Sequence, residues 1–287
     1  MRIESYHHLD QDLTQEIRAL EKVCQAADGT YRDIYLDSAF NFDLEMPVSF
    51  LAREGQQLIG FLSIYADQRE EAEVSLIVHP AHRQQGVATA LLQKATKIKE
   101  DYQILEFIFV TERCFIDDHP FIKEGFIEEV DTLEILMRAD QFNPALLKES
   151  EVRVRIARPE DLAQIASLTA MAFDETFELS ERYARESMES LENMIFVFLL
   201  DGEIVGSTAV NFTPTYYYLF SLAVHPAYQG RGVATAGIAR VMQALEEIEP
   251  LTYQLMVEKF NPAARKLYVN NGFRELTEVV YLRPKKS

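Results

Sequence analysis

The stretch HPAHRQQGVATA at residues 79–90 returns as HPAYQGRGVATA at residues 225–236, and the offset is 225 − 79 = 146 residues. Each copy follows a short apolar run and precedes an apolar pattern with helical spacing, which predicts a strand, a glycine-containing loop and a helix. A loop of small residues at a helix start presents free backbone N–H groups and the positive end of the helix dipole, and both favour a diphosphate. The repeat therefore predicts two similar domains and a diphosphate-containing ligand.

Composition and charge limit the class of protein and of partner. The 287 residues are enough for two domains, and a hydrophobic content of 48% supplies two cores. The formal net charge of −18 repels nucleic acid and anionic membranes, which we exclude as partners, and it attracts amines. The two cysteines, Cys24 and Cys114, have no metal-binding spacing, so we expect no metal site. No membrane-spanning run or signal sequence is found, and we expect a cytoplasmic protein.

The apolar patterns around the two loops occur in the same order. In the second half they predict a strand at 152–158, a helix from Pro159, a hairpin at 195–200 and 203–211, and a strand at Tyr216–Val224 before the loop. A helix, a strand at 252–257, a helix at 262–271 and a strand at 274–282 follow. The first half repeats this order from a helix at 11–26 to a strand at 104–110, and Gly60 matches Gly206. We expect domains at 1–143 and 151–287.

The loop resembles the pyrophosphate loop of the GNAT superfamily of acyl-CoA-dependent N-acetyltransferases. Its pattern is [Arg/Gln]-x-x-Gly-x-Ala directly after a strand ending in Val-His-Pro, and it is neither a Walker loop nor a Rossmann turn. The resemblance implies an α/β fold (mixed α+β) with two tandem GNAT-like domains, each a mixed, mostly antiparallel sheet flanked by helices. It also implies that the loop binds the pyrophosphate of acetyl-CoA. The cofactor-binding residues it implies are Gln229, Gly230, Arg231, Gly232, Val233, Ala234 and Thr235, and in the first copy Arg83, Gln84, Gln85, Gly86, Val87, Ala88 and Thr89.

A second motif is complete only in the second copy. The run from Asn261 to Phe273 resembles the Asn-x-x-Ala-x-x-Leu-Tyr-x-x-x-Gly-Phe helix of the same family. The resemblance implies that Tyr268 is the catalytic acid, because a phenol within reach of the thioester sulfur can protonate the departing thiolate. Asn261 either contacts the pantetheine arm of the cofactor or caps the helix at Pro262.

The first copy departs from this motif. Aligning Gly125-Phe126 on Gly272-Phe273 places Phe121 at the position of Tyr268 and Pro120 at the position of Leu267. Phenylalanine has no proton to donate, and proline interrupts a helix. We therefore expect a non-catalytic N-terminal domain that binds coenzyme A or is only structural. Unequal halves of this kind resemble tandem GNAT enzymes of the mycothiol-synthase type, in which the C-terminal domain is active.

The resemblance also implies a bulge in the strand before the loop, whose backbone N–H groups face the acetyl carbonyl. The matching residues are Leu222, Ala223 and Val224 in the second copy and Leu76, Ile77 and Val78 in the first. A general base is not defined. Many relatives have a Glu six residues before the Pro, where this chain has Phe220 and Val74, and Glu73 is expected to face the other side of the sheet. Asp174, Glu175, Glu178 or a water molecule are the alternatives.

The sequence thus predicts an acetyl-CoA-dependent N-acyltransferase that acetylates a primary amine of a small molecule or peptide by direct attack, and the acidic charge favours a cationic acceptor. Residues 152–287 are expected to perform the chemistry. The alternative is a non-catalytic protein that senses acyl-CoA, and a different acyl donor is also compatible with the loop. The chain is expected to be a monomer or a homodimer.

Overall fold

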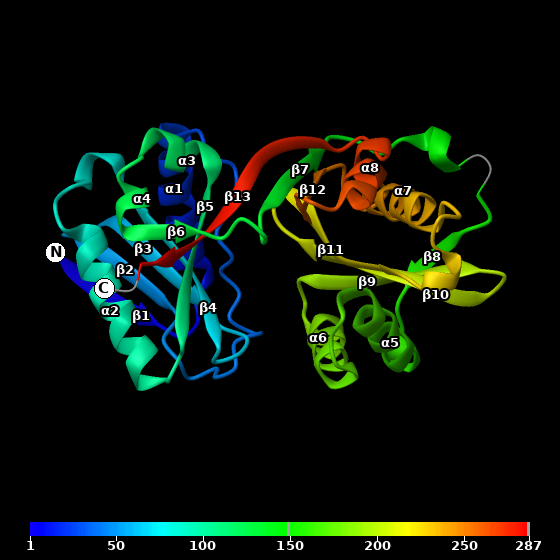
Figure 1. Ribbon diagram of the computed structural model, residues 1–287, viewed down its shortest axis with the longest axis horizontal. Coiled ribbons are helices and arrows are strands. Elements are labelled where there is room, and N and C mark those ends of the chain that lie inside the picture. The colour runs from blue at the N-terminus through cyan, green and yellow to red at the C-terminus, as the bar shows by residue number, and fades with distance from the viewer. Residues whose placement is uncertain (148–149, 286–287) are drawn as a thin grey trace. The chain divides into compact units, whose positions relative to one another are not determined.

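The apolar runs on either side of each loop form strands and helices in the predicted order in a computed structural model, which describes residues 1–147 and 150–285 (Figure 1). The first copy contains β1 (Arg2–Tyr6), α1 (Gln11–Asp28), β2 (Ser49–Glu54), β3 (Gln57–Tyr65), β4 (Glu71–Val78), α2 (Val87–Asp101), β5 (Glu106–Glu112), α3 (Arg113–Asp118), α4 (Ile122–Gly125) and β6 (Phe126–Glu128). The second contains β7 (Glu134–Ala139), β8 (Arg153–Ile156), α5 (Leu162–Phe173), α6 (Phe177–Glu189), β9 (Asn193–Leu200), β10 (Glu203–Phe212), β11 (Tyr216–Val224), α7 (Val233–Glu246), β12 (Thr252–Glu258), α8 (Pro262–Asn270) and β13 (Arg274–Pro284). Short 3-10 turns follow β4, β7, β8 and β11.

The chain forms two compact units. Unit 1 comprises residues 1–134 and the chain from Thr277 onward, and unit 2 comprises residues 135–276. These units differ from the division into 1–143 and 151–287, because most of β7 belongs to unit 2 and the greater part of β13 to unit 1. The predicted limits describe the sequence repeat, and we keep them as the proposed extent of the two copies.

Each unit contains a mixed, mostly antiparallel sheet. In unit 1 the order is β1-β2-β3-β4-β5, followed by the part of β13 that pairs with β5 and β6. In unit 2 the order is β8-β9-β10-β11-β12, with β7 beside β12. The pairs β4–β5 and β11–β12 are parallel and the other pairs described are antiparallel. This topology confirms the predicted fold class.

Helices cover both faces of each sheet because the strand residues alternate in direction. In unit 2, Phe196 and Phe198 of β9 pack with the apolar side of α7, whereas Ile195 and Val197 pack with α5 and α6. Figure 1 shows α7 and α8 on one side of this sheet and α5 and α6 on the other. None of the helices described is long and apolar enough to span a bilayer.

Local signals explain where the first helices begin and end. The carboxylate of Asp10 accepts a hydrogen bond from the N–H of Leu13 at 2.8 Å, which caps the start of α1. Gly29 ends the same helix in the left-handed region, at φ 67°.

Thr176 caps α6 in the same way as Asp10, through the N–H of Leu179 at 3.2 Å. α6 is not among the elements predicted from the sequence, although this cap and the helical spacing of Ser180, Ala184 and Ser187 mark it.

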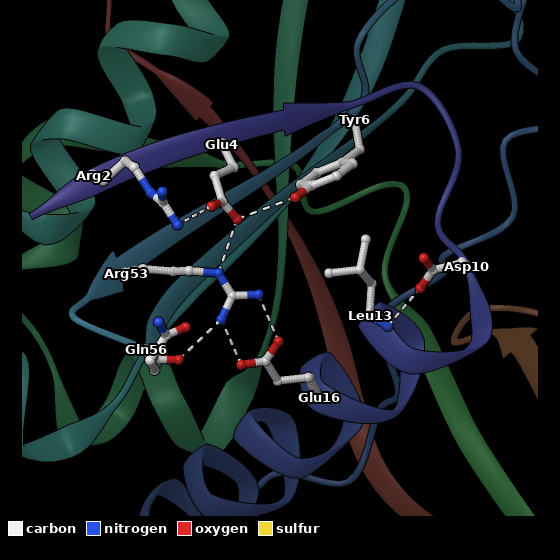
Figure 2. Close-up of polar contacts among 8 residues, drawn as sticks. All are labelled: Arg2, Glu4, Tyr6, Asp10, Leu13, Glu16, Arg53 and Gln56. Atoms are coloured by element: carbon white, nitrogen blue, oxygen red, sulfur yellow. Dashed lines mark hydrogen bonds and ion pairs between the residues drawn. The ribbon is translucent and has the colours of Figure 1, made fainter.

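Arg53 joins β1, β2 and α1 at the edge of unit 1 (Figure 2). Its Nε donates to Glu4 of β1 at 2.8 Å, and its two terminal nitrogens bind both carboxylate oxygens of Glu16 of α1 at 2.6 Å. Bidentate geometry makes this ion pair stronger than an ordinary surface pair. The hydrogen bond from Arg53 lowers the pKa of Glu4. The network therefore fixes α1 against the outer strands of the sheet.

Two glycines allow the helix after the second loop to pack closely against the sheet. A Cβ on Gly237 of α7 would lie 2.6 Å from the ring of Phe198, and a Cβ on Gly206 of β10 would lie 2.9 Å from the same ring. In unit 1 a Cβ on Gly60 would lie 2.7 Å from Val87, the first residue of α2. Gly60 therefore lets the start of α2 lie close to β3, whereas Gly206 and Gly237 leave room for the ring of Phe198 between β10 and α7.

Candidate active site

The two glycine-containing loops have the same backbone conformation. Gly230 and Gly232 have φ values of 72° and 78°, and the matching residues Gln84 and Gly86 have values of 59° and 82°. The left-handed conformation costs a residue with a side chain about 1–2 kcal/mol. Unit 1 therefore keeps the loop geometry even at Gln84, where it lacks the glycine that would favour it.

The loop of unit 2 presents a row of backbone N–H groups. Within the described part of the chain the N–H groups of residues 230–235 donate no hydrogen bond, and the first helical hydrogen bond after the loop joins the N–H of Ala236 to the carbonyl of Gly232 at 3.0 Å. No atom outside its immediate chain neighbours lies within 4 Å of the place that a Cβ on Gly232 would occupy. Open space beside unpaired donors at a helix N-terminus suits the pyrophosphate of acetyl-CoA. The same holds for residues 84–89 and Gly86 in unit 1.

The first residue of each loop pattern is bound within the protein. Gln229 donates from Nε2 to the carbonyl of Val224 at 3.0 Å and from its N–H to the carbonyl of Pro226 at 3.3 Å. Arg83 donates from Nε to the matching carbonyl of Val78 at 3.1 Å and forms a bidentate ion pair with Asp28 at 2.7 Å. Both side chains therefore attach the loop to the end of the preceding strand.

The strand before the loop is bulged in unit 2. The register between β10 and β11 joins Ser207 to Ala223 and then Ala209 to Phe220, so two residues of β11, Ser221 and Leu222, lie opposite one of β10. Ser221 adopts a left-handed conformation with φ 52°. A bulge frees backbone groups from the ladder and turns the strand locally. It falls at the point where the family resemblance implies donors to an acyl carbonyl.

Unit 1 has no bulge at the matching place. The register between β3 and β4 runs without interruption from Gly60–Val78 to Tyr65–Glu73. Ile77 and Val78, predicted as cofactor-binding, therefore lie in a regular ladder with β3, whereas the described pairing of β4 with β5 ends at Val74. β4 therefore lacks the local turn that the bulge gives to β11.

The bulge also changes which residues match between the copies. Asn211 pairs with Tyr218 and Ala209 with Phe220, while the equivalent residues Tyr65 and Ser63 pair with Glu73 and Ser75. The structural counterpart of Phe220 is therefore Ser75 rather than Val74, because the bulge inserts one residue. Glu73 lies on the face of β4 opposite to Val74, as expected. This face corresponds to the face of β11 on which Phe220 packs with α5 and α6 in unit 2. Counting back from the proline thus gave the wrong equivalence.

Tyr268 of α8 lies in the core of unit 2 on the same face as α7. Its side chain is 8% exposed, and the edge of its ring contacts Phe273 at a centroid distance of 5.8 Å. Burial raises the pKa of Tyr268 to about 12. The hydroxyl therefore remains protonated at neutral pH, as a proton donor requires.

Asn261 caps the helix that holds Tyr268. Its Oδ1 accepts a hydrogen bond from the N–H of Ala264 at 3.0 Å, which is the structural one of its two predicted roles. In unit 1 the corresponding segment is broken into α3 and α4, with Pro120 between them, as the sequence predicted. Phe121 is 62% exposed, so it differs from Tyr268 in environment as well as in chemistry.

A segment after α1 covers one face of β4 and β5 in unit 1. The carboxylate of Glu112, at the end of β5, accepts hydrogen bonds from the N–H groups of Tyr31 and Arg32, each at 2.8 Å. Glu21 of α1 accepts from the N–H of Ile34 at 2.5 Å, and both carboxylates are 3% exposed. Burial raises the pKa of Glu21. Two buried carboxylates therefore hold the backbone of residues 31–34 in place.

This segment places a cation on the face of β4 that corresponds to the face of β11 covered by α5 and α6 in unit 2. The guanidinium of Arg32 contacts the hydroxyl of Ser75 at 3.4 Å and the carboxylate of Glu73 at 3.8 Å. Ser75 is the structural counterpart of Phe220. Arg32, Glu112 and Thr208, which lies opposite the bulge in β11, are not among the residues predicted from the sequence. Comparison of the two copies could have identified Thr208, because Leu62 stands at the matching position of the first copy. The sequence contains no comparable signal for Arg32 or Glu112.

The candidate bases in unit 2 lie at the junction of α5 and α6. Asp174 ends α5 with φ 55°, and Glu178 is in the first turn of α6. Glu175 accepts a hydrogen bond from the hydroxyl of Ser180 at 2.9 Å. The role of these carboxylates as the general base remains a prediction.

Comparisons with known proteins agree with this geometry. The model of the acetyltransferase (GNAT) family matches residues 14–126 and again residues 162–273. A mycothiol acetyltransferase of Saccharomonospora viridis is 25% identical over 95% of this chain and 96% of its own length. A second, from Propionibacterium freudenreichii subsp. shermanii, is 26% identical over 83% of this chain and 77% of its own length.

Solved structures share the fold over nearly the whole chain. A GCN5-related N-acetyltransferase from Sphaerobacter thermophilus superposes with a TM-score of 0.73 at 20% identity and covers 98% of this chain and 95% of its own. A tandem GNAT protein from the clavulanic acid biosynthesis pathway superposes with a TM-score of 0.72 at 15% identity and covers 100% of this chain and 99% of its own. With two family matches that together span more than half of its length, this chain belongs to the GNAT acetyltransferase family as a tandem member, and its class is that of the acyl-CoA-dependent N-acyltransferases.

Proposed function

We propose that the protein transfers an acetyl group from acetyl-CoA to a primary amine of a small molecule or peptide, and that unit 2 performs the reaction. The observation on which this rests is the coincidence in unit 2 of the unpaired loop amides, the bulge at Ser221 and the buried Tyr268. Unit 1 has the loop alone. The three features in unit 2 correspond to the three needs of acetyl transfer: a grip on the donor, donors for the carbonyl oxygen and an acid for the sulfur.

In the proposed reaction each group of residues in unit 2 has a separate role. The N–H groups of residues 230–235 hold the pyrophosphate, and those of Leu222 and its neighbours stabilise negative charge on the carbonyl oxygen, an effect typically worth about 3–4 kcal/mol for one donor. Acetyl-CoA supplies the activated acyl group as a thioester. Tyr268 holds a proton at its hydroxyl and donates it to the departing sulfur.

The acceptor is proposed to be a primary amine that is protonated in solution. The net charge of −18 favours a cationic molecule at long range. Asp174, Glu175, Glu178 or water would remove its proton before attack. Because two relatives are named mycothiol acetyltransferases, the amine acceptor of those enzymes is one candidate substrate for an assay. We also propose a cytoplasmic location.

The loop of unit 1 has the same free amides, and we propose it as a second, non-catalytic site for the nucleotide end of coenzyme A. The regular ladder at β4, Phe121 in place of Tyr268, and Arg32 on the face of β4 that corresponds to the α5 and α6 face of β11 support the absence of turnover there.

Release of free thiol from acetyl-CoA against a panel of amines tests the proposal, with Gly232→Ala as the variant. A Cβ at φ 78° strains the loop and enters the open space beside its amides, so we expect catalytic efficiency to fall by about tenfold or more. Gly202→Ala is the matched control, because Gly202 lies in the β9–β10 turn with φ 87° and equally open space. Gly202→Ala should lose stability but keep its turnover. Equal loss in both variants would contradict a binding role for the second loop.

One observation favours a second candidate function, a sensor that binds acyl-CoA without turnover. The strand position at which many relatives have a Glu is Phe220, and it packs with α5 and α6 rather than offering a carboxylate. Calorimetry with acetyl-CoA separates the two functions: a sensor gives heat of binding without thiol release, and an enzyme gives both. Folded protein that gives no heat would exclude both.

A further inference from the structure

The bulge in β11 is fastened by a side chain of the neighbouring strand. Thr208 of β10 lies opposite Ser221 and Leu222, and its Oγ1 donates a hydrogen bond to the carbonyl of Phe220 at 3.1 Å. Its side chain has no exposure to solvent. A buried hydroxyl is more stable with a partner than without one, because an unpaired buried donor is costly. Here the partner is the carbonyl that directly precedes the extra residue of the bulge.

The matching place in unit 1 contains neither the hydroxyl nor the bulge. Leu62 stands where unit 2 has Thr208, and it pairs directly with Leu76 in an uninterrupted register. Leu62 and Thr208 are both fully buried. The two copies of the hairpin therefore differ together in one side chain and in the register of the strand opposite to it.

The bulge needs support because its conformation is unfavourable for the residue it contains. Ser221 has a side chain and yet adopts φ 52°, a region that non-glycine residues seldom occupy. Such a residue persists when surrounding contacts over-determine it. The hydrogen bond from Thr208 is a contact that a regular ladder with a leucine at this place does not contain.

We propose that Thr208 is a positioning residue for acetyl transfer, which fixes the bulge at Ser221 through the carbonyl of Phe220. It thereby holds the N–H groups of Leu222 and its neighbours in place for the carbonyl oxygen of the donor. Thr208 lies on the face of the sheet that packs against α7 and α8, since its cross-strand partner Phe196 packs there. This inference rests on the proposed function, and it adds a residue that does not touch the reacting atoms.

Three variants of unit 2 test it. Thr208→Val keeps the shape of the side chain and removes the hydroxyl, so kcat should fall by about tenfold to a hundredfold while the Kd for acetyl-CoA stays within about twofold. Thr208→Ser restores the hydroxyl and should recover most of kcat. Ser207→Ala is the matched control: the hydroxyl of Ser207 is equally buried and has no hydrogen-bond partner in the described chain, so its removal should leave kcat unchanged.

A second measurement keeps the test independent of activity. Hydrogen exchange of the amides of residues 220–223 should change in Thr208→Val and should be normal in Thr208→Ser and Ser207→Ala. If exchange and kcat in Thr208→Val match the wild type, the positioning role is wrong while the proposed function stands. If the wild type shows no turnover with any amine, the proposed function fails, and an altered exchange pattern in Thr208→Val alone would still support the role of Thr208 in holding the bulge.

Discussion

Tyr268 and Phe121 occupy matching points of the two copies, and only Tyr268 can donate a proton. In the free protein the pKa of Tyr268 is raised to about 12 by burial, whereas a free thiol has a pKa of about 8.5. Complete transfer of the proton to a thiolate is therefore uphill by about 5 kcal/mol. A proton that moves as the carbon–sulfur bond breaks avoids most of this cost. The buried position keeps the donor protonated until the sulfur departs.

Tyr268→Phe should separate catalysis from binding. We expect kcat to fall by about a hundredfold or more, in the range typical of a lost general acid, while the Kd for acetyl-CoA stays nearly constant. Because the raised pKa keeps the hydroxyl protonated until the pH approaches about 12, no loss of activity on the alkaline side below pH 10 should depend on Tyr268. Stopped-flow thiol release over a pH series, with calorimetry for binding, measures both. Equal turnover in the variant would remove the general-acid role.

At the scale of the element, the hairpins β3–β4 and β10–β11 are matching parts of the two copies, and they differ by one change of register. β4 pairs continuously with β3, while β11 gains one residue against β10. The loops after both strands keep the same conformation. The features predicted for pyrophosphate binding and for catalysis are therefore independent of one another in this fold.

The segment after α1 is held by the carboxylate of Glu112, and its loss should loosen unit 1. Both oxygens of Glu112 accept hydrogen bonds from the N–H of Tyr31, and one also accepts from Arg32. Glu112→Gln replaces one acceptor with an NH2 group that faces a donor, so we expect a loss of about 1–3 kcal/mol in the free energy of unfolding. Chemical denaturation and hydrogen exchange at residues 31–34 measure this loss.

Glu258→Gln is the control for that change, because Glu258 ends β12 as Glu112 ends β5 and its side chain is exposed. It should leave the free energy of unfolding nearly unchanged. A loss of equal size in both variants would show that position 112 has no special role in holding the segment.

At the scale of the whole molecule, the end of the second copy completes the first unit. Val279–Leu282 pairs with β5, and residues 282–284 pair with β6. Val279, Val280 and Leu282 are buried there. Arg283 forms ion pairs with Glu71, Glu106 and Glu129, all of unit 1. Unit 1 therefore depends on residues that follow the whole of unit 2 along the chain.

A chain that ends at Leu276 should lose the fold of unit 1. Each of the three buried side chains contributes about 1.5–3 kcal/mol on burial, and their removal leaves β5 as an open edge that favours aggregation. Hydrogen exchange of the β5 amides and size-exclusion chromatography report the loss. A chain that ends at Lys285 is the control and should behave as the full protein. Unchanged protection of β5 in the shorter chain would contradict a structural role for this strand.

Much of the architecture follows from local pattern, and particular elements show where that pattern ends. The bounds of β11 were predicted without error, and the break at Pro120 was expected, because both depend on neighbouring residues. The helix α6 was missed, although Thr176 caps it. The match between Phe220 and Val74 was wrong, because a bulge changes the number of residues between two points of a strand. Counting residues in the sequence assumes that this number is constant.

The sequence by itself determined the duplication, the order of strand, loop and helix, and the difference between Tyr268 and Phe121, and through the family resemblance it indicated the fold, since each depends on residue type and spacing along the chain. Only the tertiary structure decided the bulge at Ser221, the hydroxyl of Thr208 that fastens it, the position of Arg32 and the membership of β13 in unit 1. These depend on which strands become neighbours and on how one side chain meets the backbone of another strand. Such contacts join residues 12 to 212 positions apart, from Thr208–Phe220 to Arg283–Glu71, and no local pattern encodes them.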